Sequence, residues 1–495
     1  MTTTINRRAF MGTAAATAFA SATLKPDYAV AKDAYSGLDA IAQAQMVRAK
    51  KVTSLELVDA SIARIQAANP KINAVVAEYF EKARAHAKST LPQSPLSGMP
   101  YLIKDLNDIK GEVATSGSRL MAKHVGTENS LMAQKAINAG MVVVGKTNTP
   151  EFGLMASTES MLLGACRNPW NPAYSTGGSS GGAAAAVASG MLPVAHASDG
   201  GGSIRIPASC CGVFGMKPSR RRMDFGAKEK MPGDIAVENC VSRSVRDSAM
   251  VFSLSEDASP KAKFKPTSFV SGPSKKRLKI AFSTLSYYGT EPHDDVKASL
   301  EATAKLCRDL GHQIVEAKNP ITGPEFVDAF LTVWASGPAQ LVLLAQSLKL
   351  KPENVLEPWT LGLAEFYAKK PKGTLEKSLA YFHKVEAATD EFFKHCDAWL
   401  TPVLTSTPPK LGEQAPTVPF DTLYERITKY VTYTPIHNVA GTPAMSVPLG
   451  WGKNGLPIGS QFAAAKGQES LLYALAYELE NAQPWANKHG QIWAG

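Results

Sequence analysis

The stretch GGSSGGAAAAVASGMLPVAHASDGGGSIRIPAS, residues 177–209, decides the fold of this 495-residue chain. It holds two glycine-rich runs, GGSSGG at residues 177–182 and DGGGS at residues 199–203, and each run carries serine. Glycine loses the most conformational entropy on folding and buries no side chain, so these runs do not serve packing. Both runs therefore indicate places where bare backbone and a serine hydroxyl are needed together.

Three consecutive glycines, Gly200, Gly201 and Gly202, lead directly into Ser203. Consecutive small residues allow successive backbone N–H groups to point into one concavity, which is what an oxyanion hole requires. A nucleophile at the end of such a nest would attack a carbonyl whose oxygen falls among those donors. The pattern favours Ser203 as the nucleophile of an acyl transfer.

A base must take the proton of Ser203, because a free serine hydroxyl is a weak nucleophile. Lys104 is the best candidate, since it ends the apolar stretch MPYLIK, residues 99–104, which we interpret as a short buried strand. Burial disfavours the charged amine and lowers its pKa, so a neutral amine could serve as the base near neutral pH. The alternative is that Lys104 extends to solvent from the strand end, and the residues alone leave both interpretations open.

Residues 140–147, GMVVVGKT, match the phosphate-loop pattern G-x-x-x-x-G-K-[ST] letter for letter. A phosphate loop follows a strand and opens a helix, so that its N–H groups surround the phosphates. Here the order is inverted, because a helix is predicted to end at Gly140 and the strand occupies residues 141–144. We therefore predict no nucleotide site at this motif.

Residues 177–181, GGSSG, fit the G-x-S-x-G nucleophile elbow of α/β-hydrolases, and a helix-like run follows at residues 183–188. The preceding residues 168–176, NPWNPAYST, contain two prolines, so they cannot form the central strand that an elbow requires. A serine esterase of the α/β-hydrolase type remains an alternative that would need a downstream histidine. The candidates are His196, His312 and His437.

Helices and strands are predicted to alternate along the chain. The capping box TSLE at residues 53–56 begins an amphipathic helix that ends before Asn69-Pro70. Periodicity and flanking glycines predict further helices over residues 130–139 and 296–310, and strands over residues 99–104, 141–144, 278–282 and 313–315. This alternation predicts an α/β protein with helices covering a largely buried sheet, in one compact domain over residues 32–495.

The N-terminus carries the pattern of a twin-arginine export signal over residues 1–31. The pair Arg7-Arg8 precedes a mildly apolar stretch at residues 12–23 that is too short to span a bilayer. Ala29-Val30-Ala31 is the best cleavage site, although Ala20-Ser21-Ala22 also fits, and a disordered cytosolic tail is the alternative interpretation. We expect an exported protein, periplasmic or extracellular, in which no later segment reaches the apolar length of a membrane helix.

The formal net charge is +10, but the basic residues are not gathered into a stripe. The densest runs, RRR at residues 220–222 and KKR at residues 275–277, lie near proline or glycine without interleaved aromatic residues, which favours a solvated surface over nucleic-acid binding. The six cysteines form no C-x-x-C pair, so buried thiols are expected. If the protein is exported, some of these cysteines could instead form disulfides, and the sequence does not show which.

Three segments together resemble the amidase signature family. They are residues 177–209, MPYLIKD at residues 99–105, and HNVAGTPAMSVPLGWGKNGLPIGSQF at residues 437–462. Within that family, CRNPWN at residues 166–171 and LENAQPW at residues 479–485 are most similar to the 6-aminohexanoate cyclic-dimer hydrolase branch. The resemblance implies the fold of the family, a large mixed central β-sheet covered by helices on both faces.

The resemblance also implies a Ser–cis-Ser–Lys triad and an acyl-enzyme intermediate. Lys104 falls on the base, Ser179 on the bridging serine that follows a cis peptide bond, and Ser203 on the nucleophile. The implied oxyanion donors are the N–H groups of Gly200, Gly201, Gly202 and Ser203. Gly200 is usually a residue with a side chain in this family, so the nest is expected to be looser here.

Three further residues take supporting roles by the same resemblance. Asp199 and Arg205 flank the glycine loop, residues 200–203, and fix its shape. Ser180 caps a helix or donates a hydrogen bond within its own loop. The implied activity is an amidase that hydrolyses the C–N bond of a small linear or cyclic amide, with no metal and no cofactor. No nucleic acid and no membrane span are expected, and a homodimer is compatible with the family.

An amidotransferase-like subunit of the same fold is a second alternative. Such a subunit works on charged tRNA with a partner in the cytosol. The predicted export signal argues against it.

Overall fold

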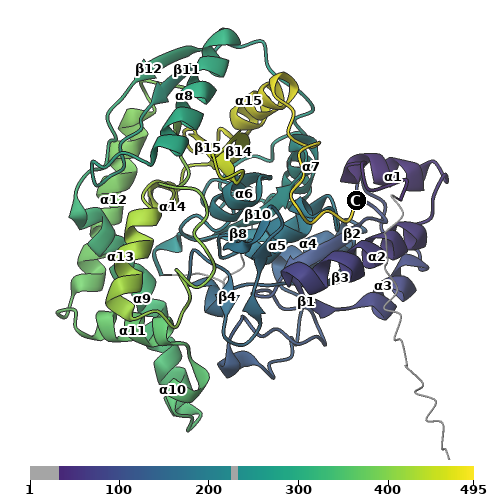
Figure 1. Cartoon of the computed structure of the whole chain (residues 1–495), viewed down its shortest axis with the longest axis horizontal. Helices are drawn as coiled ribbons and strands as arrows, with labels where there is room; N and C mark the ends of the chain where they lie inside the picture. Colours follow the sequence, from purple (N-terminus) through teal and green to yellow (C-terminus); the bar gives the residue numbers. More distant parts are fainter. Residues whose placement is uncertain (1–32, 224–231) are drawn as a thin grey trace, which may run out of the picture.

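A computed structural model describes residues 33–223 and 232–495 of the chain (Figure 1). The helices α1 to α3, drawn in purple, lie at one end of the molecule, and the green helices α9 to α13 lie at the other. The predicted export signal, residues 1–31, lies outside the described residues and stays a prediction.

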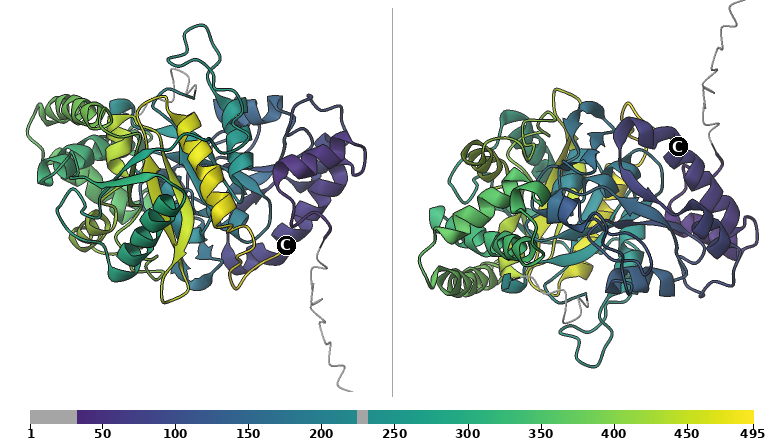
Figure 2. Two further views of the ribbon diagram at one scale, coloured as in Figure 1. Left: turned by 90° about the horizontal axis from the view of Figure 1, so that it is seen from above. Right: turned by 90° about the horizontal axis from the view of Figure 1, so that it is seen from below.

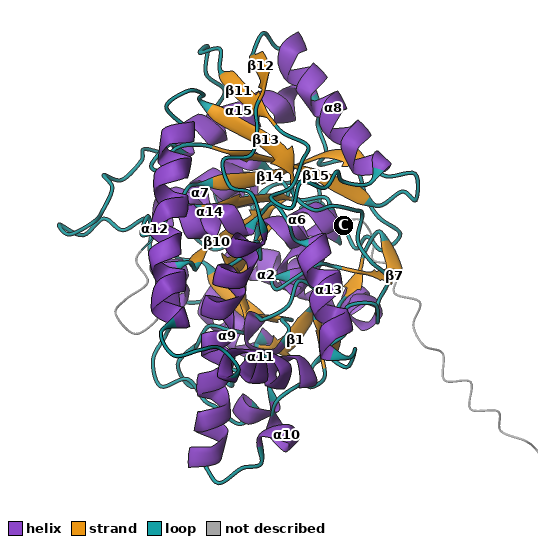
Figure 3. Cartoon of the chain, turned by 90° about the vertical axis from the view of Figure 1, so that its left-hand side faces the viewer, coloured by secondary structure: helices purple, strands orange, loops and turns teal. Residues whose placement is uncertain are grey.

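A large mixed sheet, drawn in orange in Figure 3, runs through the molecule. Strand β11 pairs in parallel with β12 and β13, whereas every other pair of neighbours in this sheet is antiparallel. Among the described residues its order is β12 (Gln313–Glu316), β11 (Lys279–Phe282), β13 (Ala398–Pro402), β15 (Pro457–Ala463), β14 (Ala444–Trp451), β9 (Phe214–Lys217), β10 (Val237–Ser242) and β8 (Val194–Asp199). The mixed sheet implied by the resemblance is confirmed.

A smaller sheet lies beside the last strand of the large one. Its order is β1 (Val75–Glu78), β3 (Val142–Thr147) and β2 (Pro100–Lys104). Strand β2 packs alongside β8, and the backbone N–H of Lys104 donates to Nδ1 of His196 on β8 over 3.2 Å. This contact brings Lys104 to the strand that leads into the glycine loop. Two short hairpins join β4 (Glu159–Ser160) to β5 (Gly164–Ala165) and β6 (Arg167–Asn168) to β7 (Asn171–Ser175).

Helices cover both faces of the large sheet (Figure 2). Successive side chains of a strand point to opposite faces, and β13 shows the consequence. Ala398 and Leu400 pack in one cluster with α7 (Val245–Ser255), α8 (Asp294–Asp309) and α15 (Glu469–Ala482). Trp399 packs in another cluster with α9 (Pro324–Ser347), α12 (Thr374–Phe392) and α14 (Pro435–Ala440).

The helices of the N-terminal half pack mainly around β2, β3 and β8, except for the helix at residues 205–211, which packs against β9, β14 and β15. They are α1 (Ala40–Arg48), α2 (Ser54–Ile72), α3 (Phe80–Ala87), α4 (Leu131–Asn138), α5 (Gly181–Ala188) and α6 (Arg205–Cys211). Short helices α10 (Pro352–Val355), α11 (Pro358–Ala368) and α13 (Phe420–Tyr430) complete the other end of the molecule.

Two predicted elements end later than the sequence indicated. Helix α2 continues through Pro70 to Ile72, because Asn73 adopts a left-handed conformation with φ of 55° and donates its N–H to the Asn69 carbonyl over 2.7 Å. Strand β3 continues through Gly145 to Thr147, because β1 and β2 pair with its two edges. The phosphate-loop pattern is therefore a strand, as its inverted order indicated.

One helix corrects the expectation that no later segment is long and apolar enough to cross a membrane. Helix α9 has 24 residues with a best-window mean hydropathy of 1.4, and half of that window is buried within the protein. Its apolar residues pack against α11 and α12. This packing inside the protein explains why the helix is apolar, although its length and hydropathy alone would also fit a membrane helix.

Candidate active site

Lys104 lies at the end of β2 and is fully buried. Its Nζ donates to Ser179 Oγ over 2.7 Å, to Ser180 Oγ over 2.8 Å and to Ser198 Oγ over 3.0 Å. These contacts exclude the interpretation in which Lys104 extends to solvent. The amine at the end of β2 is therefore directed at two hydroxyls of the first glycine-rich run and at one hydroxyl of β8.

The environment of Lys104 favours a neutral amine. Burial lowers its pKa to about 7, although the carboxylates of Glu238 and Asp199 act in the opposite direction. A buried cation loses its hydration, so the uncharged form is favoured. Near neutral pH the amine of Lys104 is therefore able to accept a proton.

The first glycine run positions Ser179. The Gly178–Ser179 peptide bond is cis, and Gly177 has φ of 68°. A Cβ at Gly178 would lie 2.6 Å from the carbonyl oxygen of Ser157, so no larger residue fits there. The glycines thus allow a close backbone approach that brings Ser179 Oγ to Lys104.

Ser180 precedes α5 but its side chain does not cap that helix. Its Oγ donates to the Ser198 carbonyl over 3.1 Å and accepts the Ser198 N–H over 3.2 Å, in addition to its bond with Lys104. Of the two roles considered for Ser180, the structure therefore favours the hydrogen-bonding one. Its N–H also donates to the Ser203 carbonyl over 3.3 Å, which joins the two glycine runs.

Asp199, the last residue of β8, shapes the glycine loop. Its carboxylate accepts the N–H of Gly202 over 2.8 Å and the N–H of Ile204 over 3.1 Å. The carbonyl of Gly201 accepts the hydroxyl of Thr434 over 2.7 Å. The N–H of Gly202 is thus engaged within the loop, and the amides of Gly200, Gly201 and Ser203 are the ones without an acceptor among the described residues.

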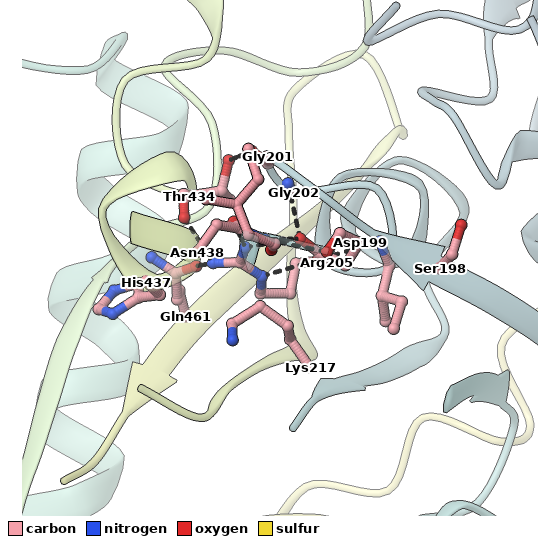
Figure 4. Close-up of polar contacts among 12 residues, drawn as sticks. Ser198, Asp199, Gly201, Gly202, Arg205, Lys217, Thr434, His437, Asn438 and Gln461 are labelled. Carbon is pink, nitrogen blue, oxygen red and sulfur yellow. Dashed lines mark hydrogen bonds and ion pairs between the residues drawn. The ribbon is translucent and has the colours of Figure 1, made fainter. Parts of the chain in front are cut away.

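Arg205 holds Asp199 from below the loop (Figure 4). The two fully buried side chains form a bidentate ion pair, with Nη2–Oδ1 at 2.9 Å and Nε–Oδ2 at 3.0 Å. Burial alone would raise the pKa of Asp199, but the Arg205 guanidinium, Lys217 and Asn438 lower it to about 2. Asp199 is therefore an anion held in place by Arg205 beside the glycine loop.

Several residues that were not predicted from the sequence complete this network. Arg205 also donates to the Thr434 carbonyl, to Gln461 Oε1 and to Asn438 Oδ1, over 2.9, 2.8 and 2.7 Å. Asn438 and Gln461 belong to the C-terminal segment that carried the family resemblance, which was the available signal. Ser198 gave no signal, and Figure 4 shows its side chain directed away from Asp199.

The three histidines considered for an esterase triad serve other purposes. Nδ1 of His196 accepts the Lys104 N–H, Nδ1 of His312 accepts the Leu278 N–H, and His437 pairs with the Thr442 hydroxyl. Within residues 33–223 and 232–495, none of them hydrogen-bonds a serine of either glycine run. The segment before Ser179 is β7 in a two-stranded hairpin, so the central strand of a nucleophile elbow is also missing there.

A cavity of about 610 Å³, which includes space open to solvent, reaches Ser203. Ser203, Gly201, Gly178 and Gly153 are among its lining residues, so a substrate in the cavity would lie next to Ser203 and the glycine loop. No hydrogen bond joins Ser203 Oγ to Ser179 Oγ in the described part of the chain. Lys104 and Ser179 are thus in direct contact, whereas Ser203 is linked to this pair through Ser180, whose N–H donates to the Ser203 carbonyl.

A sequence model of the family described as Amidase matches residues 56–473. The chain belongs to the amidase signature family. It is an amidase, a hydrolase of the C–N bond in amides.

The relatives of this amidase extend over nearly its whole length. The AmiC protein of Mycobacterium tuberculosis (strain ATCC 25618 / H37Rv) is 36% identical over 472 residues, which cover 93% of this chain and 98% of AmiC. The 6-aminohexanoate-cyclic-dimer hydrolase of Pseudomonas sp. (strain NK87) is 34% identical over 488 residues, 92% and 96% of the two chains.

The structure of a 6-aminohexanoate cyclic dimer hydrolase complexed with substrate is similar to this amidase at a TM-score of 0.85 and 31% identity, covering 92% of this chain and 99% of that one. The predicted fold and the predicted similarity to this branch of the family are confirmed.

Proposed function

We propose that this amidase hydrolyses small carboxylic amides through an acyl-enzyme on Ser203, with Ser179 and Lys104 as the proton relay. The observation that supports the proposal is the fully buried Lys104 amine, 2.7 Å from the hydroxyl of Ser179, next to Gly178 in the cavity lining. A serine nucleophile needs such a neighbouring base, and a desolvated lysine supplies one.

The acylation step follows from this arrangement. Ser203 Oγ bonds to the carbonyl carbon of the amide while its proton passes to Ser179 Oγ, and the Ser179 proton passes to the neutral Lys104 amine. The resulting oxyanion accepts hydrogen bonds from the free N–H groups of the glycine loop. When the C–N bond breaks, the proton returns through Ser179 to the departing nitrogen, which leaves as an amine.

Deacylation uses the same relay with water in place of Ser203. A water molecule bonds to the acyl carbon and gives its proton to Ser179, as Ser179 passes its own to Lys104. The ester bond to Ser203 then breaks and the proton returns to Ser203 Oγ. The products are a carboxylic acid and the original enzyme.

A fluorophosphonate probe, which labels activated serine hydroxyls, tests this proposal. We expect Ser203→Ala to abolish labelling. The matched control is Ser189→Ala, because the Ser189 hydroxyl donates to the Ala186 carbonyl and takes no part in the site. Full labelling of the Ser203→Ala variant would show that another residue is the nucleophile.

We further propose that residues 1–31 direct export of the amidase domain, residues 32–495, by the twin-arginine route. The proposal rests on the Arg7-Arg8 pair and the apolar stretch behind it. Replacing both arginines by lysine should leave the protein in the cytoplasm on cell fractionation. Unchanged export of that variant would contradict this route.

A further inference from the structure

Helix α9 presents an aromatic face to the substrate cavity. Phe326, Phe330 and Trp334 follow one another at four-residue spacing, which places them on one side of a helix. The ring centroids of Phe330 and Trp334 lie 5.6 Å apart with nearly parallel planes, and those of Phe326 and Phe330 lie 6.2 Å apart. Phe330 and Trp334 line the cavity and are only half-buried, so their rings are available to a ligand.

This aromatic face lies directly on the glycine loop. A Cβ at Gly201 would lie 3.0 Å from Cζ of Phe330, so the edge of the ring touches the loop that offers the oxyanion donors. The Thr434 hydroxyl holds the Gly201 carbonyl in place from the other side. When the carbonyl group of a substrate binds in the glycine loop, the groups attached to its carbon therefore lie close to Phe330.

The two ends of a bound amide can be distinguished. The departing nitrogen must face Ser179, which supplies its proton, and Ser179 Oγ lies 3.1 Å from the position of a Cβ at Gly153. The acyl group is the other substituent of the carbonyl carbon and extends away from Ser179, and we assign to it the wall that Phe330 forms beside the glycine loop. The aromatic face of α9 is thus the wall of the acyl side.

The remaining wall of the cavity has no group that could pair with a charge. No aspartate, glutamate, lysine, arginine or histidine is present among the described lining residues. The polar side chains of Tyr287, Trp359 and Thr428 already donate to the backbone carbonyls of Val431, Leu154 and Tyr424, over 2.8, 3.2 and 2.7 Å. A charged substituent would lose its hydration there without compensation.

We propose that the substrate of this amidase carries an uncharged, apolar or aromatic acyl group that packs against Phe330 and Trp334. The proposal rests on the proposed function, because it assumes that the carbonyl is attacked by Ser203 in the glycine loop. The enzyme should therefore prefer amides with a neutral acyl group over amides whose acyl group ends in a carboxylate or an ammonium group.

Three p-nitroanilides, which share the same leaving group, test the preference for a neutral acyl group on the wild-type enzyme. The heptanoyl and 6-aminohexanoyl compounds differ in a terminal methyl or ammonium group, and the adipoyl compound ends in a carboxylate. We expect kcat/KM for the heptanoyl compound to exceed that for either charged compound by about 100-fold or more, because the charge is desolvated without a partner. Values within about threefold of one another would overturn the proposal.

Variants of α9 test the residues that form the wall. We expect Phe330→Ala and Trp334→Ala to lower kcat/KM for the heptanoyl anilide by about tenfold or more, and for the acetyl anilide by less than about threefold, because a methyl group does not reach the wall. Leu343→Ala is the control, since Leu343 lies on the same helix, is 56% exposed and does not line the cavity. An equal loss on both anilides would overturn the assignment of these residues.

Fluorophosphonate labelling of the same samples separates this proposal from the proposed function. Labelled enzyme that hydrolyses neutral and charged anilides alike would refute the substrate preference and leave the Ser203 mechanism standing. Labelling that survives Ser203→Ala would refute the mechanism itself.

Discussion

At the scale of single residues, the pKa of Lys104 determines the chemistry that the site can perform. The charge of Glu238 on β10 raises that pKa, as does the charge of Asp199, and burial lowers it more strongly. His196 lies between Lys104 and Glu238, with its Nε2 3.7 Å from the Glu238 carboxylate. Groups on two neighbouring strands thus set the protonation of the amine.

The pH profile of the enzyme should report this balance. Activity requires the neutral amine, so kcat/KM should rise with pH through an apparent pKa of about 7, the value for Lys104. Glu238→Gln removes the negative charge that raises this pKa, so the acidic limb should move to lower pH. The amide can still accept the hydrogen bond that Asn107 donates to Glu238.

Two outcomes would contradict this prediction. They are an acidic limb that stays in place in Glu238→Gln, and one that moves to higher pH. Glu78→Gln is the control, because Glu78 is an exposed residue at the end of β1 and should leave the profile unchanged.

At the scale of the elements, the match to a phosphate loop shows how context overrides a motif. Gly145 occupies the middle of β3, where a Cβ would lie 2.2 Å from the carbonyl oxygen of Ala77 on β1. Lys146 is fully buried and pairs with Asp105 at 3.2 Å. The glycine and lysine of the pattern therefore serve strand pairing and a buried ion pair.

Gly145→Ala should destabilise the protein, because the added methyl group overlaps backbone that cannot move away. We expect a loss of about 1–3 kcal/mol in the free energy of unfolding, measured by denaturant titration. Gly337→Ala in α9 is the control, since no atom lies within 4 Å of the added Cβ. ATP with magnesium should leave the Tm of the wild type unchanged, and a Tm that rises with ATP would refute the strand interpretation.

At the scale of the whole molecule, one buried side chain joins segments that are far apart in the sequence. Arg205 at the start of α6 contacts Asp199 on β8, Thr434 and Asn438 around α14, and Gln461 on β15. The glycine loop is thus anchored to the C-terminal third of the chain. Its shape depends on the assembled fold and not on the loop alone.

Arg205→Met should lower both stability and labelling of Ser203. Removing one partner of a buried ion pair leaves the other charge unpaired, which costs about 3–5 kcal/mol in the free energy of unfolding. Because the pKa of Asp199 is lowered to about 2, the contribution of the pair is complete above about pH 4 and is lost as the pH falls toward 2. The difference in Tm between wild type and variant should therefore narrow at acidic pH.

A surface pair provides the matched control for this prediction. Lys305 bridges Asp309 along α8 and is 72% exposed, so Lys305→Met should not change the Tm measurably. A stable Arg205→Met variant with normal labelling would show that the loop holds its shape without the network.

The sequence by itself determined the local features of this amidase. Helix and strand periods placed each of the predicted elements within a few residues, although many elements were not predicted. The glycines before Ser203 indicated a nest of N–H groups, because such signals depend on neighbouring residues alone. The local sequence did not show that Lys104 is buried against Ser179, that the Asp199 carboxylate accepts the N–H of Gly202, or that Phe330 lies against Gly201. Those contacts join residues from 3 to more than 100 positions apart, and the assembled layers set their distances.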